Sequence, residues 1–313
     1  MGRLFPFREQ VLDSFEMSEL FTFVVPSSSR KKRLDEFLFE RFSAVSRMYL
    51  REVVRDGLCE VNGRHENRGY ELMTSDFIEI RLDPARHATM HPENIALEII
   101  FEDEFLLVVN KPPGMLVHPT VGVRSGTLLN ALSHHLNPTS ESCGSNALNR
   151  AGLIHRLDKD TSGLLVVAKE KRTHRILASH FQRKLIEKKY FAVVDGRPEN
   201  REGTINLPIG RSEEERIWRV DETGKPAITN FQIVSSNGEA SLLELEPVTG
   251  RTNQLRIHLA AMGTPIVGDV KYGGSDFVRL CLHSCLLKFK HPTDGRVLEF
   301  KSDVPSDFLS VTA

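Results

Sequence analysis

The chain has 313 residues, of which 40% are hydrophobic and 27% charged, a composition that is ordinary for a globular protein with a sizeable core. No run of about 18 apolar residues occurs, so we expect no membrane span. Acidic residues interrupt the N-terminal segment, so we expect no secretory signal and a cytoplasmic protein. The formal net charge of −1 does not support a nucleic-acid partner, because phosphate binding requires cationic surface.

The four cysteines are scattered along the chain, as Cys59, Cys143, Cys281 and Cys285. Their spacing fits neither a disulfide framework nor the paired, closely spaced ligands that mark structural zinc. Cys281 and Cys285 are the only close pair, and the surrounding LCLHSCLLKF is typical of a buried strand. We therefore expect reduced thiols and no metal site.

Residues 1–20 are polar and predict a tail, whereas residues 21–85 have the pattern of a small α+β module. FTFVV predicts a strand, and RLDEFLFERF has its apolar residues at helical spacing. SRMYLREVVRDG predicts a second helix, which Ser46 caps and Gly57 ends. The Asn-Gly pair in LCEVNG predicts a hairpin turn, and DFIEIRL predicts the last strand.

A polar, proline-containing linker is predicted at residues 86–97, followed by a second domain at residues 98–313. Its apolar segments predict strands: LEIIFED, FLLVVNK, GLLVVAK, KKYFAVV, ITNFQIV, SLLELEPV and LLKFKH. One helix is clear among them, KRTHRILASHFQRKL, in which Leu177 and Phe181 share a face. Many strands with few helices predict an α+β domain on a mixed, largely antiparallel sheet, with residues 136–150 as a surface loop.

The segment HRLDKDTSG brings the most chemically active side chains together between two predicted strands. Charged groups at the edge of a core are costly unless they are paired or functional, so this segment is the candidate site. It supplies two carboxylates, a histidine, two hydroxyls and two cations: Asp158, Asp160, His155, Thr161, Ser162, Arg156 and Lys159.

The residues alone leave several interpretations of this segment open. A solvated turn would use its Asp and Thr side chains to cap neighbouring backbone. An aspartyl phosphotransferase would need magnesium and further acids downstream, for which the chain offers only Asp269 in GDVKYGG. A Ser162–His155–Asp158 hydrolase lacks the G-x-S-x-G elbow around its serine.

HRLDKDTSGLLVVAK strongly resembles the central motif of the RluA-type RNA pseudouridine synthases. VVNKPPGMLVHPT resembles a family segment upstream, and KKYFAVVDG, LPIGR, GKPAITNF and VTGRTNQLRIHLAAMGTPIVGDVKYG resemble family segments downstream. The resemblance extends over about residues 98–300 and implies the pseudouridine synthase fold, with a mixed sheet and a central cleft.

The resemblance implies an isomerase that breaks the N-glycosidic bond of a uridine in RNA and rejoins the uracil to ribose through carbon. It makes Asp158 the catalytic carboxylate, Tyr190 the aromatic side chain that stacks on the displaced base, and Asp160 a structural partner. It nominates Arg256 to lower the pKa of Asp158 and keep it ionised; otherwise Arg256 is an ordinary strand surface charge. Asp158 either attacks the anomeric carbon or removes the neighbouring sugar proton. Nothing is added or lost, so no cofactor and no metal are implied.

The N-terminal module resembles the alpha-L RNA-binding module, although a generic helical cap would give a similar pattern. From Arg30 to Arg68 the chain has ten Lys or Arg against seven Asp or Glu, a modest cationic excess. Candidate RNA contacts are His118, Arg156 and Arg251 in the second domain and Lys31, Lys32, Arg47 and Arg51 in the module.

The module favours large-subunit ribosomal RNA as the partner, with transfer RNA as the alternative, and we expect a monomer. A non-catalytic RNA-binding assembly factor is a different class of function, which the combination of Asp158, Tyr190 and Arg256 argues against. One departure from the family occurs in the third motif, where Asn253 replaces the usual histidine. Asn also donates and accepts hydrogen bonds, so we expect the loop geometry to survive.

Overall fold

The computed structural model divides the chain into two compact units, Met1–His91 and Pro92–Ala313. Their boundary falls inside the predicted linker. The structure describes residues 19–42, 45, 47–82, 92–120, 123, 125–136, 152–212 and 217–312. Outside this description lie several predicted features: most of the tail, the first half of the linker, the Ser46 cap, the side chain of Arg47, and the loop after Leu136 with Cys143.

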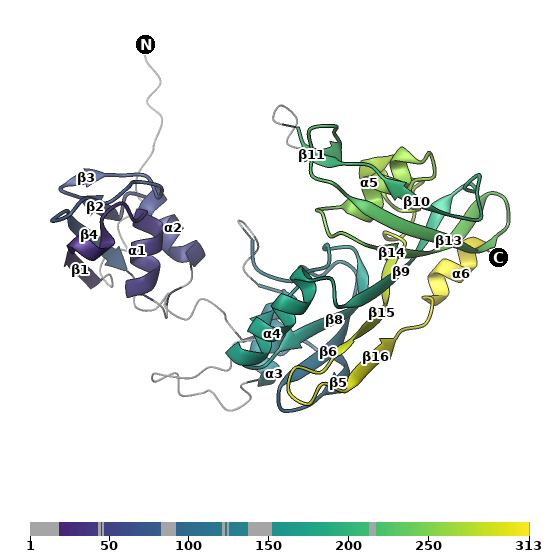
Figure 1. The fold of residues 1–313 in the computed structure, drawn as a ribbon, viewed down its shortest axis with the longest axis horizontal. Coiled ribbons are helices and arrows are strands. Elements are labelled where there is room, and N and C mark those ends of the chain that lie inside the picture. Colours follow the sequence, from purple (N-terminus) through teal and green to yellow (C-terminus); the bar gives the residue numbers. More distant parts are fainter. Residues whose placement is uncertain are drawn as a thin grey trace, which may run out of the picture. The chain divides into compact units, whose positions relative to one another are not determined.

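The first unit contains, in its described part, two α-helices and a four-stranded antiparallel sheet (Figure 1). Its elements are β1 (Glu19–Val24), the 3-10 turn η1 (Ser27–Ser29), α1 (Leu34–Arg41), α2 (Arg47–Arg55), β2 (Cys59–Val61), β3 (Arg64–His65) and β4 (Phe77–Leu82). The strand order is β1-β4-β2-β3, so the last strand lies between the first strand and the hairpin. The predicted helix pair and hairpin are present, but β1 begins at Glu19, within the segment expected to be a tail.

Apolar side chains of both helices and of the sheet form the core of the first unit. Leu38 of α1, Leu50 of α2 and Ile80 of β4 are each at most 1% exposed. The hairpin turns at Asn62 and Gly63, whose φ angles of 52° and 73° lie in the left-handed region that a two-residue turn requires. The Asn-Gly pair thus provides the local signal for the pairing of β2 with β3.

The second unit is built, in its described part, on one ten-stranded sheet with four α-helices. The strands are β5 (Glu98–Glu102), β6 (Leu106–Lys111), β7 (Gly152–Leu153), β8 (Ser162–Ala168), β9 (Glu187–Asp195), β10 (Glu202–Asn206), β13 (Ile228–Ser236), β14 (Ala240–Pro247), β15 (Leu282–Lys290) and β16 (Val297–Lys301). A separate ribbon pairs β11 (Ile209–Arg211) with β12 (Trp218–Val220). The helices are α3 (Leu128–Leu136), α4 (Lys171–Gln182), α5 (Gln254–Ala261) and α6 (Ser306–Thr312), with the 3-10 turn η3 at Val270–Tyr272.

The main path of the sheet runs β10-β13-β14-β9-β15-β8-β6-β5, and β16 and β7 pair with β15 and β8. Among the pairs of described strands, β8 with β15 is parallel, and the others are antiparallel. The predicted α+β class with a mixed, largely antiparallel sheet is confirmed. Each predicted strand is present in the sheet.

The strands β6 and β8 are buried on both faces, which explains their unbroken apolar sequences. On one face, Leu106 and Val108 pack in a cluster with Leu177 of α4. On the other face, Leu107 and Val109 belong to a larger cluster that includes apolar residues of α3. The strand that follows the candidate site, β8, and its neighbour β6 are therefore held from both sides.

Three helices of the second unit, α3, α5 and α6, were not clear from the sequence. The helix α5 buries Leu255, Ile257 and Leu259 in a span of eight residues, so it lacks a single apolar stripe. The helix α6 has seven residues, too few for a periodic pattern to be distinctive. None of the helices in the described ranges is both long and apolar enough to cross a membrane.

Gly163 lies where β8 meets β15, directly after the candidate site loop. Its φ of +109° is rarely adopted by other residues, and a Cβ there would collide with the backbone of Ser284. Gly238 also has a positive φ, +95°, but no atom lies within 4 Å of the position of its Cβ. Alanine at Gly163 would therefore introduce both backbone strain and a collision with β15, whereas alanine at Gly238 would introduce backbone strain alone.

We expect Gly163→Ala to lower the free energy of unfolding of the second unit by about 4 kcal/mol, because backbone strain and overpacking add. Gly238→Ala should cost about 1 kcal/mol, because only strain is introduced. Urea denaturation followed by the fluorescence of Trp218, the single tryptophan of the chain, measures both. Equal losses would contradict the close backbone contact between β8 and β15.

Candidate active site

The HRLDKDTSG segment forms the loop between β7 and β8. The sequence predicts a buried strand before this loop, but β7 is only two residues long and half-buried. Leu157 is 4% exposed and packs into the main core, which fixes the middle of the loop. Asp158 is the next residue, and its side chain is 28% exposed. The loop thus holds the candidate catalytic carboxylate at the boundary between core and solvent.

A buried lysine holds the backbone of this loop. Lys111, at the end of β6, is 1% exposed, and burial lowers its pKa to about 8. Its ammonium donates to the carbonyl oxygens of Pro112 at 2.7 Å, Met115 at 2.9 Å and Lys159 at 3.0 Å. The last of these bonds fixes the residue that follows Asp158. The sequence analysis did not identify Lys111, although a lysine after the buried FLLVVN run was a visible signal.

Ser162 and His155 have separate partners, so the hydrolase interpretation is wrong. The hydroxyl of Ser162 lies 2.8 Å from Nδ1 of His283 and accepts a hydrogen bond from Arg279 at 2.8 Å. The Nε2 atom of His155 accepts a hydrogen bond from the backbone N–H of Val166 at 3.1 Å. Burial lowers the pKa of His155 to about 3, so its ring is a neutral structural brace.

The carboxylate of Asp158 faces the guanidinium of Arg256 at 3.9 Å. Arg256 lies on α5, not on a strand. It donates its two short hydrogen bonds to Asp269, from Nε at 2.7 Å and from Nη2 at 2.6 Å. Asp269 is 1% exposed, so this bidentate pair fixes the direction of Arg256. The same two hydrogen bonds occupy the carboxylate of Asp269, the acid that the phosphotransfer interpretation would require for magnesium.

The pKa of Asp158 lies above its ordinary value of 3.8. Burial raises it, and the charges of Arg256 and Arg156 lower it without full compensation. The predicted action of Arg256 therefore has the right direction, but burial outweighs it, so the net pKa of Asp158 is raised. A carboxylate with a raised pKa is a stronger base, which suits proton removal or attack on carbon.

Asn253, which replaces the usual histidine, begins α5 with a φ of +54°. Asn tolerates this left-handed conformation better than most residues do. Its side chain donates to the hydroxyl of Tyr272 at 3.0 Å, and the guanidinium carbon of Arg256 lies 5.1 Å from the centre of the Tyr272 ring. Asn253 therefore supports Arg256 through Tyr272.

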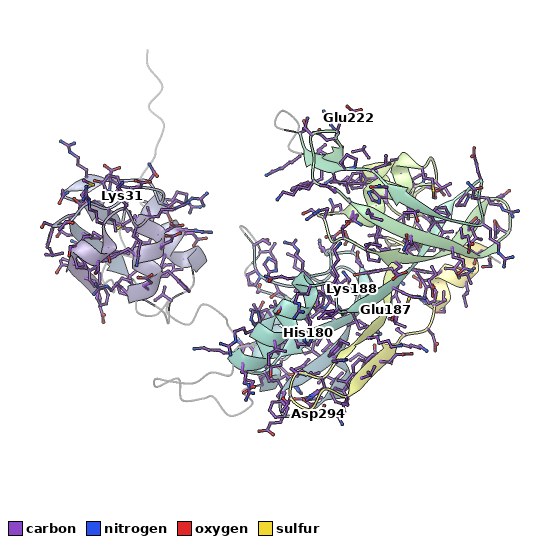
Figure 2. The ribbon with its side chains drawn as sticks, in the orientation of Figure 1. Lys31, His180, Glu187, Lys188, Glu222 and Asp294 are labelled. Carbon is purple, nitrogen blue, oxygen red and sulfur yellow. The ribbon has the colours of Figure 1, made fainter. Side chains whose placement is uncertain are left out.

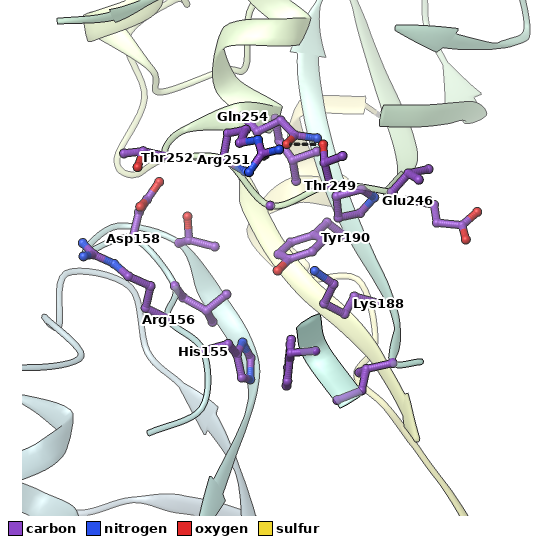
Figure 3. A pocket seen from close by; sticks show the side chains of 18 of the residues that line it. His155, Arg156, Asp158, Lys188, Tyr190, Glu246, Thr249, Arg251, Thr252 and Gln254 are labelled. Atoms are coloured by element: carbon purple, nitrogen blue, oxygen red, sulfur yellow. Dashed lines mark hydrogen bonds between the residues drawn. The ribbon is translucent and has the colours of Figure 1, made fainter. Parts of the chain in front are cut away.

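Gln254 holds the loop that precedes Arg256. Its Oε1 accepts from the Thr249 hydroxyl at 2.7 Å and from the Arg251 backbone N–H at 3.0 Å (Figure 3). Its Nε2 donates to the carbonyl of Ile228 at 2.9 Å. The guanidinium of Arg251 donates to the carbonyl of Pro226 at 3.1 Å, so this predicted RNA contact is partly occupied within the protein.

One cavity of about 1040 Å³ brings the main candidates together. Its lining includes Asp158, Tyr190 and Arg256, together with Arg156 and Arg251. Tyr190, on β9, is 9% exposed, and burial raises its pKa to about 12, so its hydroxyl stays protonated. Figure 3 shows the Tyr190 ring facing the side of the cavity that carries Asp158. The predicted catalytic residues therefore share one pocket.

The remaining predicted residues lie elsewhere or differ in detail. His118 does not line this cavity, although its pKa is lowered by burial and by the charge of Arg156. In the first unit, Lys32 pairs with Glu40 at 2.7 Å and Arg51 with Asp35 at 3.1 Å, whereas Lys31 is exposed (Figure 2).

Asp160 acts on its surroundings through its charge, which raises the pKa of the buried Lys111 against the larger lowering by burial. It is exposed, and it makes no hydrogen bond or ion pair with the described residues. Cys281 and Cys285 are buried, as the strand interpretation of LCLHSCLLKF predicts. The described residues contain no group of three or more His, Cys, Asp or Glu side chains placed to hold a metal ion.

The sequence matches known proteins over most of its length. It is 38% identical to an uncharacterised RNA pseudouridine synthase of Bacillus subtilis, covering 90% of this chain and 93% of that one. It is 37% identical to the ribosomal large subunit pseudouridine synthase D of Zymomonas mobilis, covering 88% and 91% of the two chains. A rice protein named RNA pseudouridine synthase 2, chloroplastic, is 33% identical over 92% of this chain and 80% of its own.

Solved structures also resemble a large part of the chain. The human RNA pseudouridylate synthase domain containing protein 1 aligns with a TM-score of 0.56 and 28% identity, over 71% of this chain and 88% of that one. The human domain containing protein 4 aligns with the same TM-score and 26% identity, over 68% and 90%. The family model described as RNA pseudouridylate synthase matches residues 105–261, which contain the Asp158 loop, Tyr190 and Arg256. The chain belongs to the RNA pseudouridylate synthase family.

Proposed function

We propose that this enzyme converts specific uridines of large-subunit ribosomal RNA to pseudouridine, with Asp158 as the carboxylate that acts on the ribose. The observation that carries the assignment is the half-buried Asp158, which shares a cavity with Tyr190 and faces Arg256 at 3.9 Å. Relatives such as the Zymomonas mobilis protein are named for the ribosomal large subunit, which favours this RNA over transfer RNA.

Asp158 has the environment that the reaction on the sugar requires. Its negative charge stabilises an electron-poor anomeric carbon, and the same carboxylate either attacks that carbon or removes the adjacent sugar proton. Arg256, fixed by Asp269, stabilises the ionised form and its direction without forming a short ion pair. Tyr190 offers a ring on which a uracil displaced from its helix can stack.

The helix α4 offers a cationic surface for RNA, despite the net charge of −1 of the whole chain. From Lys171 to Ile186 the sequence contains no Asp or Glu. Its cations are exposed and form no ion pair with the described residues: Lys171, Arg172, Arg175, Arg183 and Lys184. The C-terminal end of α4 contributes Phe181 and Gln182 to the lining of the cavity. We propose that the RNA backbone follows α4 toward Asp158.

The first unit adds RNA affinity in this proposal, as an alpha-L type module. Lys31 is its best-placed cation, because it is exposed and has no carboxylate partner among the described residues. Lys32 and Arg51 contribute less, because Glu40 and Asp35 already neutralise them. We also propose that the enzyme is a monomer and that it is located in the cytoplasm. The rice relative differs in location, since its name describes it as chloroplastic.

Deleting the gene and mapping pseudouridine across all cellular RNA should show the loss of specific sites in large-subunit ribosomal RNA. The parent protein should restore them, whereas Asp158→Asn, which keeps the shape but removes the negative charge, should not. Binding of the variant to RNA and its circular dichroism should match the parent. If the lost sites lie in transfer RNA instead, transfer RNA is the substrate. If Asp158→Asn restores the sites, the catalytic assignment is refuted and an assembly role is favoured.

The single-turnover rate should fall as the pH is lowered through a pKa above 3.8, because Asp158 must be ionised and its pKa is raised. Arg156→Gln should move this acid limb to higher pH, since the charge of Arg156 lowers the pKa of Asp158. Lys159→Gln, at an exposed neighbour, is the control and should leave the limb in place. If the rate of Arg156→Gln falls at the same pH as that of the parent, the charge of Arg156 does not act on the pKa of Asp158 and the prediction is wrong.

Replacing Arg172, Arg175 and Arg183 together by Gln should weaken RNA binding and flatten its salt dependence. Removing one phosphate interaction reduces the slope of log affinity against log salt by about 0.7–0.9. The matched control replaces Arg197, Arg201 and Lys290, which are exposed and do not line the cavity. Lys31→Gln tests the first unit in the same salt series. Equal slopes for the α4 and control variants would exclude α4 from the RNA path.

A further inference from the structure

Lys188 is a cation of the cavity that the account of Asp158 does not use. It lies at the start of β9, two residues before Tyr190 (Figure 2). Its side chain lines the same cavity as Asp158 and Tyr190, and its nitrogen points into the cavity toward Tyr190 (Figure 3). In this view Asp158 lies to the left of Tyr190 and the nitrogen of Lys188 lies just below its ring, so both charges border the place proposed for the stacked base.

The ammonium of Lys188 has no anionic partner among the described residues. Burial lowers its pKa, and no neighbouring carboxylate opposes this effect. Its aromatic neighbour is Phe181, whose ring centre lies 5.7 Å from the nitrogen. The Phe181 ring is stacked on the ring of His155, with the two ring centres 4.6 Å apart. Burial lowers the pKa of His155 to about 3, so its ring is neutral and gives Lys188 no anionic partner.

Two other buried or half-buried lysines near this site are satisfied within the protein, whereas Lys184 at the rim of the cavity is exposed to solvent. Lys189, the next residue along β9, forms an ion pair with Glu244 at 2.7 Å. Lys111 donates to three backbone carbonyls. The cavity also contains Glu187, whose charge acts on Lys288, and Glu246, whose charge acts on Lys189. Lys188 therefore differs from Lys189 and Lys111 in lacking a compensating group, and from Lys184 in being partly buried.

A partly buried cation without a partner opposes folding, so its retention in a reaction cavity points to a partner that arrives with the substrate. In pseudouridine formation the bond between C1′ and N1 breaks, and its electron pair passes to the uracil ring. The ring nitrogen and the carbonyl oxygens share this negative charge. In either route Asp158 is engaged with the sugar at this step, through the bond to C1′ or through the sugar proton, so another group must stabilise the charge on the uracil.

We propose that Lys188 is a catalytic residue that donates a hydrogen bond to the departing uracil and stabilises its negative charge. The ring then turns, and an electron pair at C5 forms the new bond to C1′. C5 loses its proton and N1 gains one, so atoms and charge balance, and Lys188 stays protonated throughout. This inference rests on the proposed function, in which Asp158 acts on the sugar.

Lys188→Met should lower the single-turnover rate at saturating RNA by about 100-fold or more, the usual effect of removing one donor to a developing anion. RNA affinity and its salt slope should change little. Thermal stability should stay equal or rise, because no ion pair is lost. Lys189→Met is the control and should keep its rate, while Lys188→Arg should recover part of the activity because it restores a cationic donor.

A fluorinated substrate separates charge stabilisation from simple positioning. Fluorine at C5 withdraws electrons, so 5-fluorouracil bears a negative charge more readily than uracil and depends less on Lys188. With 5-fluorouridine at the mapped site of an RNA fragment, the ratio of parent to Lys188→Met rates of nucleoside consumption should shrink. An unchanged ratio would overturn the proposal and leave Lys188 a positioning residue.

Two further outcomes are distinguishable from these. A normal saturated rate for Lys188→Met with weaker binding and a flatter salt slope would make Lys188 a phosphate contact and refute the proposal. Activity in Asp158→Asn would instead remove the proposed role of Asp158, whatever the result for Lys188. The two variants assayed side by side on both substrates therefore test the two assignments separately.

Discussion

The contact between β8 and β15 at Gly163 is the constraint on which the geometry of the site depends. The loop of Asp158 leads into β8, Tyr190 and Lys188 lie on β9, and β15 runs between these two strands. Neighbouring strands are about 4.8 Å apart, so the two walls of the site are held about 10 Å from each other at their bases. The bonds of Ser162 to His283 and Arg279 fasten the same point through side chains.

Asp158 and Arg256 carry opposite charges in the site, but no short ion pair joins them. Arg256 directs its shortest hydrogen bonds to Asp269, so its interaction with Asp158 is longer and only partly offsets the effect of burial. Asp158 can therefore change its bonding during the reaction without first breaking a short ion pair. Lys188 carries the opposite charge and is compensated even less, because no carboxylate among the described residues opposes the effect of its burial.

The sequence predicted the parts that depend on local pattern or on a contiguous motif. The strands, α4, the Asn-Gly hairpin, Asp158 and Tyr190 belong to this group. The interactions of Lys111 and Asp269 could not be predicted, because their partners become neighbours only through the fold. The sequence could not give the net pKa of Asp158 for a related reason, since the extent of its burial depends on the loop and cavity around it.

The separate cores of the two units have a consequence for how the protein denatures. Unit Met1–His91 buries its own apolar cluster, and so does unit Pro92–Ala313. Cooperativity need not extend across the whole chain, so a single melting temperature does not describe it. Trp218 reports only on the second unit, whereas circular dichroism reports on both. Disagreement between these two probes would measure how far the small unit melts on its own, while the larger unit keeps its fold.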